Sequence, residues 1–447
     1  MKGVFFSVPL GFALENCLQG QTAAQSGSPI IVGGASSAMN ARPGLAASAS
    51  GTTVAAMPGA TIIGRTPTSR TWSWIASQTN AGQATLVTNS YVEVASGLCH
   101  SNAVGELVDA VEQIDIVADG ASASQAAHHV HFKGNINAGG GGSVHLVAPD
   151  GQVFDSQVYG LAYVDTASGS NVLVAPLQDA AGVVVGNNIV LYANAFNGVK
   201  ADIEYVFKKS GLEQNIILRE QPPSPASLAG FNPQTTRLQV LTEFFQPVVP
   251  QIKKLTFQGS QEDAVLKFGA TSIGPGRAFY AEVPGQGPVA VKPGRVAKHW
   301  TQIAGRQFLI EEIPWPAISN AVQNLPLHAA ATNRNRAAIR RTASLLPLRP
   351  RNVAGTTKSG PMKVAEAMPK QAGLVIDYAT VNGSSSGIEF TGGTTYWVSG
   401  SLWVDCPGTV TFDGGTIVKI DNSADASIFN SGCSTTVFNT SPRSMPN

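Results

Sequence analysis

The stretch Val199–Leu218 constrains the fold more than any other part of this 447-residue chain. Apolar and polar residues alternate in its first half, with Ala201, Ile203, Tyr205 and Phe207 as the apolar set and Lys200, Asp202 and Glu204 as the polar set. A period of two predicts a strand with one buried and one solvated face. Lys208–Gly211 supplies turn residues and Asn215–Leu218 returns, so the stretch predicts an antiparallel hairpin.

Composition agrees with an all-β chain. Only 13% of the residues are charged, and glycine alone contributes 47 residues. Soluble globular domains typically carry about 25% charged residues, and low charge with abundant Gly, Thr and Val is typical of extracellular β-proteins. The formal net charge of +1 points to no polyanionic partner, so specific nucleic-acid binding is not expected.

Short strand-like runs continue on both sides of the hairpin. Val92 and Val94, for example, alternate with Glu93, which indicates a strand with two faces of different polarity. Several such runs separated by turn residues are typical of a β-sandwich. We therefore expect a β-sandwich-like domain over 85–225 and a second β region over 226–326, either in the same domain or in a second one.

The N-terminus has the features of a secretory signal. Lys2 precedes an apolar run, Gly3–Leu14, that is too short to span a bilayer, and small residues around Ala23 offer a cleavage site. We expect residues 1–24 to be a signal peptide, hence a secreted or cell-surface location. Residues 25–84 are rich in small residues and are expected to be a mostly disordered leader. No other stretch approaches the roughly 20 apolar residues of a membrane span, so none is expected.

Residues 327–370 are strongly basic. They hold nine Arg and Lys residues and one acidic residue, Glu366. Such a segment fits either a solvated linker between domains or an electrostatic surface for a polyanion. Because no aromatic residues interleave with the charges for base stacking, we interpret it as a linker.

The pattern changes after residue 371. Very short strand-like runs alternate with Gly-containing corners and comprise Thr395–Val398, Ser401–Val404, Thr409–Phe412 and Thr416–Ile420. Strands this short suit the rungs of a parallel β-helix, whose coils bury their apolar positions against one another. A small sandwich is the alternative. We expect residues 371–447 to be the start of a β-helix, truncated at Asn447, since such a helix needs more coils and a cap.

Three segments resemble a module of large secreted, RHS-type and wall-associated bacterial proteins: Tyr192–Phe196, Gly198–Tyr205 and Gly211–Leu218. In that module a strand ending in Asp-x-x-Tyr precedes a Gly-x-x-(Glu or Gln)-x-hydrophobic return strand. Ile217–Pro225 with Leu238–Phe244 is similar to secreted proteins in which a right-handed, pectin-lyase-like parallel β-helix follows. The resemblance implies an extracellular location and brings no catalytic residues, and the sequence lacks RHS tyrosine-aspartate repeats.

These features predict an all-β fold in which one or more β-sandwich-like domains precede the first coils of a right-handed parallel β-helix, with a disordered N-terminal leader. The sequence lacks a P-loop, a dinucleotide glycine fingerprint, a His-Glu-x-x-His motif and a nucleophile elbow between strand and helix. The only cluster suited to a metal comprises His128, His129 and His131 with His145 nearby. Histidines on the polar face of a strand are more common, so we assign no metal or other cofactor.

Two functions of different classes fit this sequence. The favoured one, which is not enzymatic, is a structural or adhesive module that binds glycans or extracellular or cell-surface proteins. The other is a carbohydrate-active enzyme, a polysaccharide lyase or hydrolase with its groove on the β-helix. Its acid–base candidates are Asp377, Asp405, Asp413, Asp421 and Asp425. Asp413 and Asp421 stand in ordinary turn sequences, which favours the first function.

Five side chains of the last segment are candidate site residues. Tyr396, Trp397 and Trp403 are candidates for stacking on a sugar ring, and Tyr396 and Trp397 must point to opposite faces of their strand. Cys406 and Cys433 are candidates for a disulfide in an oxidising compartment. Cys99 would then stay unpaired, which predicts burial as a small hydrophobic residue.

Overall fold

The computed structural model describes residues 59–80, 82–139, 141–246, 249–256, 262–274, 276–281, 294–327, 360–365, 373–382, 385–390, 395–398, 401–413, 416–420, 427–430 and 435–439. The chain divides into two units, Met1–Arg42 and Pro43–Asn447, and all described residues belong to the second. The expected signal peptide and the leader up to residue 58 lie outside the described residues.

The described part of the chain is mostly β, with 62% strand in several antiparallel and mixed sheets, so the expected class is confirmed at this level. One helix, α1 (Trp315–Gln323), was not expected. Pro316 lies in its first turn, and its buried residues Trp315, Ile318 and Val322 recur at helical spacing. At nine residues α1 is too short to cross a membrane, and the described residues contain no longer helix.

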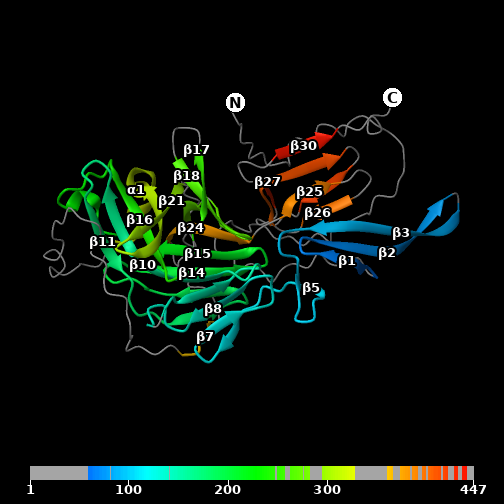
Figure 1. Cartoon of the computed structure of the whole chain (residues 1–447), viewed down its shortest axis with the longest axis horizontal. Helices are drawn as coiled ribbons and strands as arrows, with labels where there is room; N and C mark the ends of the chain where they lie inside the picture. The colour runs from blue at the N-terminus through cyan, green and yellow to red at the C-terminus, as the bar shows by residue number, and fades with distance from the viewer. Residues whose placement is uncertain are drawn as a thin grey trace. The chain divides into compact units, whose positions relative to one another are not determined.

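A first group of paired strands is drawn from both predicted β regions (Figure 1). It comprises β6 (Asp115–Val117), β7 (Gly120–Ala123), β8 (His129–Lys133), β9 (Val144–Val147), β10 (Val153–Asp165), β11 (Asn171–Pro176), β16 (Thr236–Phe244), β21 (Gly294–Ile303) and β22 (Arg306–Pro314). Antiparallel pairs join them in the order β6–β7–β8–β9–β10–β16–β22–β21, and β11 also pairs with β10.

A second group is built around the predicted hairpin. It comprises β12 (Gly182–Val185), β13 (Ile189–Tyr192), β14 (Ala201–Lys208), β15 (Gly211–Leu218), β17 (Gln251–Thr256), β18 (Glu262–Phe268), β19 (Thr271–Ile273), β20 (Gly276–Ala281), β23 (Lys363–Ala365) and β24 (Gly373–Asn382). The pairing order is β23–β12–β13–β14–β15–β24. Both β19 and β20 pair with β24, and β18 and β17 follow β19.

One hydrophobic core takes side chains from both groups. Ring centroids of Phe132 and Tyr205 lie 5.4 Å apart, and those of Phe154 and Phe268 lie 5.2 Å apart. The pairing of β10 with β16 further joins the regions predicted over 85–225 and 226–326. Strands of these two regions therefore share sheet pairings and one hydrophobic core.

The hairpin β14–β15 confirms the predicted strands, with pairs from Ala201–Leu218 to Lys208–Gly211. The predicted solvated face is wrong, because Asp202 and Glu204 are only 4% and 3% exposed. Side chains of the return strand and of the residue after it bind one oxygen of each carboxylate, while Glu204 Oε2 has no hydrogen-bond partner among the described residues. Arg219 Nε donates to Asp202 Oδ2 at 2.7 Å, and Asn215 Nδ2 donates to Glu204 Oε1 at 2.9 Å. Buried polar groups are tolerated where partners of this kind are present.

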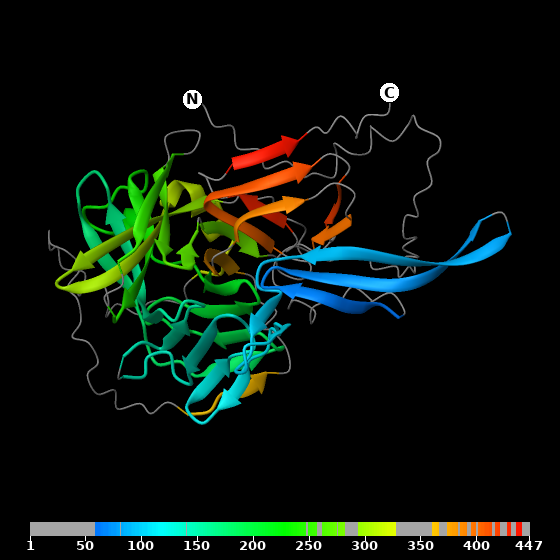
Figure 2. The ribbon, with the colours of Figure 1, turned by 45° about the vertical axis from the view of Figure 1, so that its right-hand side comes forward.

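The prediction of a mostly disordered leader reaching residue 84 is wrong for its last part. Residues there form β1 (Thr61–Thr66), β2 (Ser69–Asn80) and the start of β3 (Gln83–Val94), which pair antiparallel in that order. Low charge and small residues suggested disorder, but Thr, Val, Ile and Trp also favour strands. Figure 2 shows β2 and β3 side by side as one long hairpin.

The base of this hairpin contacts the strands of the core. The strands β4 (Cys99–Ser101) and β5 (Leu107–Asp109) follow β3 and pair with each other. Between β3 and β4, Gly97 has φ +71°, and a Cβ there would lie 2.0 Å from the Lys209 carbonyl oxygen in the β14–β15 turn. Only glycine fits such an approach. The short 3₁₀ turn Pro225–Ser227 completes the described elements of this part.

Two strands after residue 326 pair with strands of the second group. Most of the basic linker, 328–359, lies outside the described residues, but β23 pairs in parallel with β12. The strand β24 pairs antiparallel with β15 along its length from Leu374 to Val381. It therefore belongs with the antiparallel strands, and the group of strands that pair in parallel with one another begins at Ser385.

Candidate interaction surface

Six strands after residue 385 pair with one another only in parallel in the part of the chain that is described. They are β25 (Ser385–Phe390), β26 (Thr395–Val398), β27 (Ser401–Asp413), β28 (Ile417–Ile420), β29 (Ser427–Asn430) and β30 (Thr435–Asn439). We call them the coil stack. They are the orange-to-red strands of Figures 1 and 2.

The register of the coil stack repeats. Gly387 lies opposite Thr409 and Thr395 lies opposite Ile417, in both cases 22 residues later. Thr409 in turn lies opposite Thr435, 26 residues later, and β27 and β29 have the same offset. The chain thus returns beside itself after 22 and then 26 residues. Parallel neighbours need a long connection between them, which these intervals supply.

A column of three aromatic rings follows this repeat, and we call it the phenylalanine ladder: Phe390, Phe412 and Phe438. The Phe390 and Phe412 rings stack at 4.8 Å between centroids and 6° between planes. Phe412 and Phe438 stack at 5.2 Å and 12°. Tyr396 contacts Phe390 edge-on at 5.0 Å. Aromatic contacts of this kind add to the stabilisation from burial.

The strand β3 lies beside β26, on the edge of β26 that faces away from β28. It pairs in parallel with β26, so that Val92 lies opposite Tyr396 and Val94 opposite Val398. Val94 is 1% exposed and joins the apolar cluster of the stack. The sheet order is β1–β2–β3–β26–β28. The N-terminal strands β1, β2 and β3 therefore extend this sheet beyond β26.

Polar partners fix Glu93, which alternates with these valines as the sequence predicted. Its carboxylate accepts hydrogen bonds from Arg70 at 2.9 and 2.6 Å and from Trp72 Nε1 at 2.8 Å. The Trp72 ring also stacks on Tyr91, with 6.3 Å between centroids. Burial, reinforced by the Glu93 carboxylate, raises the pKa of Tyr91 to about 12. The hairpin thus presents valines to the stack and holds its charges on the other face.

Cys99 is buried and free, as the sequence predicted. Its Sγ lies 3.8 Å from Asp109 Oδ1, and that carboxylate also binds Arg65 and Arg70 at 3.1 and 3.2 Å. Burial first, and then the Asp109 carboxylate, raise the pKa of the Cys99 thiol to about 11. Because the thiolate is the reactive form, this thiol is unreactive at neutral pH.

Exposure of the apolar positions rises from the earlier to the later of these parallel strands. In the phenylalanine ladder, Phe390 is 0% exposed, Phe412 is partly buried and Phe438 is 73% exposed. In the pair β26–β28, Val398 is 0% exposed, whereas Ile420, which lies opposite it on β28, is 37% exposed. Among the described residues, no strand covers β28, β29 or β30 on the side away from the earlier coil. This end is the candidate interaction surface.

The expected sugar-stacking residues separate in the structure. Tyr396 is 7% exposed and packs in the apolar cluster, which leaves no ring face open to a sugar. Trp397 is partly exposed on the opposite face, and its Nε1 is buried with no hydrogen-bond partner in the described residues. For Trp403 only the backbone pairing is described, opposite Phe429. The three residues do not form one platform.

Other candidates of the last segment are described only in part. Cys433 and the side chain of Cys406 lie outside the described residues, so their disulfide stays a prediction. Asp421 and Asp425 also lie outside the described residues, as do the side chains of Asp377 and Asp405. Asp413 ends β27, and Thr416 N donates to its carbonyl oxygen at 3.2 Å.

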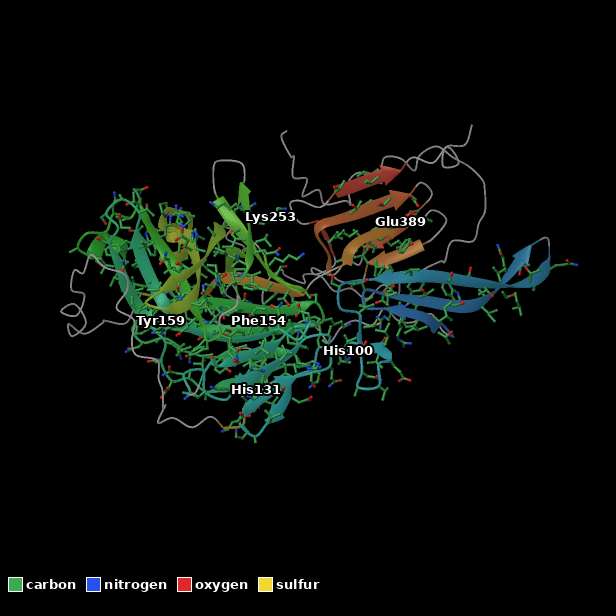
Figure 3. The ribbon with its side chains drawn as sticks, in the orientation of Figure 1. His100, His131, Phe154, Tyr159, Lys253 and Glu389 are labelled. Atoms are coloured by element: carbon green, nitrogen blue, oxygen red, sulfur yellow. The ribbon has the colours of Figure 1, made fainter. Side chains whose placement is uncertain are left out.

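The four histidines do not converge. His128 is fully buried, whereas His129 is exposed. His131, which Figure 3 labels, lies opposite His145, but each is close to a different carboxylate: Asp119 at 3.3 Å and Asp155 at 2.6 Å. No group of three or more His, Cys, Asp or Glu side chains suited to a metal ion occurs among the described residues.

The sequence analysis did not predict the phenylalanine ladder. Its signal is the recurrence of a phenylalanine at the end of three short β-prone runs, 388–390, 410–412 and 436–438. The unequal intervals of 22 and 26 residues hide it from a search for a fixed period. The pairing of β3 with β26 has no local signal at all.

Comparison of the chain with protein-family models, curated proteins and solved structures gives no match. The resemblance to RHS-type and wall-associated modules therefore stays a prediction.

Proposed function

We propose that the chain is a secreted or cell-surface structural or adhesive module, in which a β-sandwich-like body carries the first coils of a right-handed parallel β-helix. The observation that carries the proposal is the repeated parallel register of the coil stack with its phenylalanine ladder. Stacked coils that bury equivalent apolar positions are the defining feature of such helices. Low charge and the N-terminal apolar run support an extracellular location.

The N-terminal hairpin is the cap of this β-helix in our proposal. Terminal repeats of solenoids need a cap with a polar outer face. The strand β3 offers Val92 and Val94 to the first coil, and on its other face the buried Glu93 is neutralised by the buried Arg70 and hydrogen-bonded by Trp72. A hairpin that supplies the first rung gives the coils a template for parallel pairing.

The ladder supplies a test of the coil stack. Phe412 stacks on both neighbouring rings, so we expect Phe412→Ala to destabilise the stack by about 2 kcal/mol or more. Phe438→Ala is the matched control, because Phe438 has one ladder partner and is 73% exposed. Its cost should stay near 0.5–1 kcal/mol. Hydrogen exchange of the backbone amides of β25, β27 and β30 measures both.

Faster exchange in these strands for Phe412→Ala, with β14 and β15 unchanged, supports a stack of mutually stabilising coils. Equal effects of the two substitutions would contradict it, because the central ring would then contribute no more than the terminal one.

One observation keeps the carbohydrate-active enzyme as a second candidate. Glu389, labelled on β25 in Figure 3, is exposed and alternates with the buried Phe390. Asp413 follows the ladder residue Phe412 on the neighbouring strand β27, so both carboxylates belong to the outward face of adjacent coils. Carboxylates placed in this way suit general acid–base chemistry.

Polysaccharide assays distinguish the two functions. We expect the protein to be retained on one or more immobilised glycans or extracellular proteins and to release no oligosaccharides from anionic polysaccharides. If the protein cleaves a polysaccharide and both Glu389→Gln and Asp413→Asn abolish the cleavage, the result supports the function of a carbohydrate-active enzyme. Absence of both retention and cleavage across the panel would count against adhesion to these partners.

A further inference from the structure

A small cleft lies among the antiparallel strands and is lined by no residue of the coil stack. Its lining residues come from the connection between β11 and β12, from the loop between β13 and β14, and from the stretch after β15. The cleft has a volume of about 260 Å³, and six side chains of its wall are Gln178, Asn194, Phe196, Val199, Lys200 and Glu220. Pockets for drug-sized ligands hold about 300–1,000 Å³, so this cleft suits one small ring better than a longer ligand.

Hydrogen bonds hold the wall of this cleft in place. The backbone N–H of Gln178 donates to the Ala195 carbonyl oxygen at 2.9 Å, and Gln178 Nε2 donates to the Asn194 carbonyl oxygen at 2.8 Å. The backbone N–H of Asn194 donates in turn to Oδ1 of the buried Asp202. A site that is held in this way loses little conformational freedom when a ligand binds.

The wall contains one buried charge and one exposed charge. Glu220 is only 3% exposed, and its Oε1 accepts the backbone N–H of Lys200 at 2.6 Å. A carboxylate shielded from bulk water binds hydroxyl groups more strongly than an exposed one, because the local dielectric constant is lower. The Lys200 ammonium is exposed, so water and salt screen its charge more effectively.

The rest of the wall is uncharged. Phe196 and Val199 are each 2% exposed and supply apolar surface. The amides of Gln178 and Asn194 carry groups that donate and groups that accept hydrogen bonds. A matching ligand therefore has an apolar face and hydroxyl groups that both donate and accept. A sugar ring has these properties, since its C–H groups form an apolar face and its hydroxyl groups surround it.

We infer that this cleft binds a single neutral sugar unit of a glycan. The inference rests on the proposed adhesive function and gives it a class of ligand. An anionic sugar would place a second negative charge beside the buried Glu220, and the screened Lys200 would offset only part of that cost. Any charged ligand would also lose hydration against Phe196 and Val199. A neutral ring avoids both costs.

Titrations of the full chain followed by saturation-transfer NMR test the inference, with the methyl glycosides of glucose, galactose, mannose and N-acetylglucosamine as probes. We expect at least one of them to bind with a dissociation constant on the order of 1 mM, because one ring offers few contacts. Asn194→Gly should weaken this binding about 3–10-fold through loss of the side-chain amide. Glycine adopts the φ of +52° found at Asn194 without strain, so the loop keeps its conformation.

Asn197→Gly is the matched control. It makes the same change at an exposed position of the same loop that does not line the cleft, so the dissociation constant should stay unchanged. Glu220→Gln keeps an acceptor for the Lys200 N–H but removes the buried charge, and should weaken binding about tenfold or more. Lys200→Gln should change it less than about threefold.

Three results would overturn the inference. The first is that none of the methyl glycosides binds, and the second is that only the charged probes glucuronate or glycine bind. The third is that Asn194→Gly and Glu220→Gln both bind the sugar as tightly as the wild-type protein, which places the sugar elsewhere.

Retention on immobilised glycans and proteins separates this inference from the proposed function. If the wild-type protein and both cleft variants are retained equally, adhesion holds and the cleft is not its site. If the cleft binds a methyl glycoside but the protein is retained on no immobilised partner, the inference holds and the adhesive function fails.

Discussion

Lowering the pH from 7 to about 4 should destabilise the native protein by about 3 kcal/mol through His128 alone. This side chain is 0% exposed, and its ring lies 4.8 Å from that of Phe207. Burial lowers the pKa of His128 to about 3. Between the ordinary pKa of 6.5 and that value, the unfolded chain binds a proton that the folded chain does not. Stability from this group is therefore complete above pH 6.5 and falls by roughly 1.4 kcal/mol per pH unit below it.

Urea unfolding at pH 7, 5 and 4 measures this effect. The wild-type protein and the His128→Leu variant should differ in their slope with pH, because leucine cannot take up a proton. His129→Leu is the matched control, because His129 is adjacent to His128 in the sequence but is exposed. Carboxylates contribute equally to all three proteins. Identical slopes for wild type and His128→Leu would rule out the buried histidine as the source of acid sensitivity.

Removing Arg219 should cost about 3–5 kcal/mol, because Arg219→Leu leaves Asp202 buried without its cation. The two residues are 6% and 4% exposed, and Nε lies 2.7 Å from Oδ2. Asp202 Oδ1 also accepts the backbone N–H of Asn194 at 2.8 Å, so the carboxylate fixes the loop before β14 as well. Nearby, burial raises the pKa of Glu204; the Asp202 carboxylate adds to this rise and the Arg219 guanidinium opposes it.

The same hairpin contains a matched control. Lys208 and Glu213 form a partly exposed pair at 3.0 Å, and the Lys208→Leu variant should lose no more than about 1 kcal/mol. Denaturant unfolding compares the two variants. The double variant Asp202→Leu/Arg219→Leu should recover part of the stability lost in Arg219→Leu, since no charge is left unpaired. If Arg219→Leu and Lys208→Leu lowered the free energy of unfolding equally, the buried Asp202–Arg219 pair would contribute no more to stability than the partly exposed Lys208–Glu213 pair.

Local patterns predicted the strands better than their surroundings. The alternation in β14 placed the hairpin correctly, because a period of two follows from strand geometry alone. It did not predict that Asp202 and Glu204 are buried, since their partners Arg219 and Asn215 come from the return strand and the residue that follows it. Burial of a polar residue depends on such partners, and a single-strand pattern does not contain them.

The candidate surface shows the same limit. Short runs separated by turns predicted the strands of the last segment, and the spacing of the phenylalanines was available in the sequence. The pairing of β3 with β26 was not predictable, because the strand pairs Val92–Tyr396 and Val94–Val398 join residues with no relation in local sequence. Small uncharged residues in 61–84 resembled a disordered leader, although they pair along two full strands.

The pairing of β3 with β26 can form only long after β3 has been synthesised. About 300 residues separate the two strands, and at roughly 5–20 residues per second a ribosome needs about 15–60 seconds to make them. During that interval the outer edge of β3 has no β26 to pair with, although β2 and β3 are already complete. The long separation also slows folding, since contacts of high sequence separation form late. A nascent chain of this protein therefore presents the open edge of β3 until β26 has been synthesised.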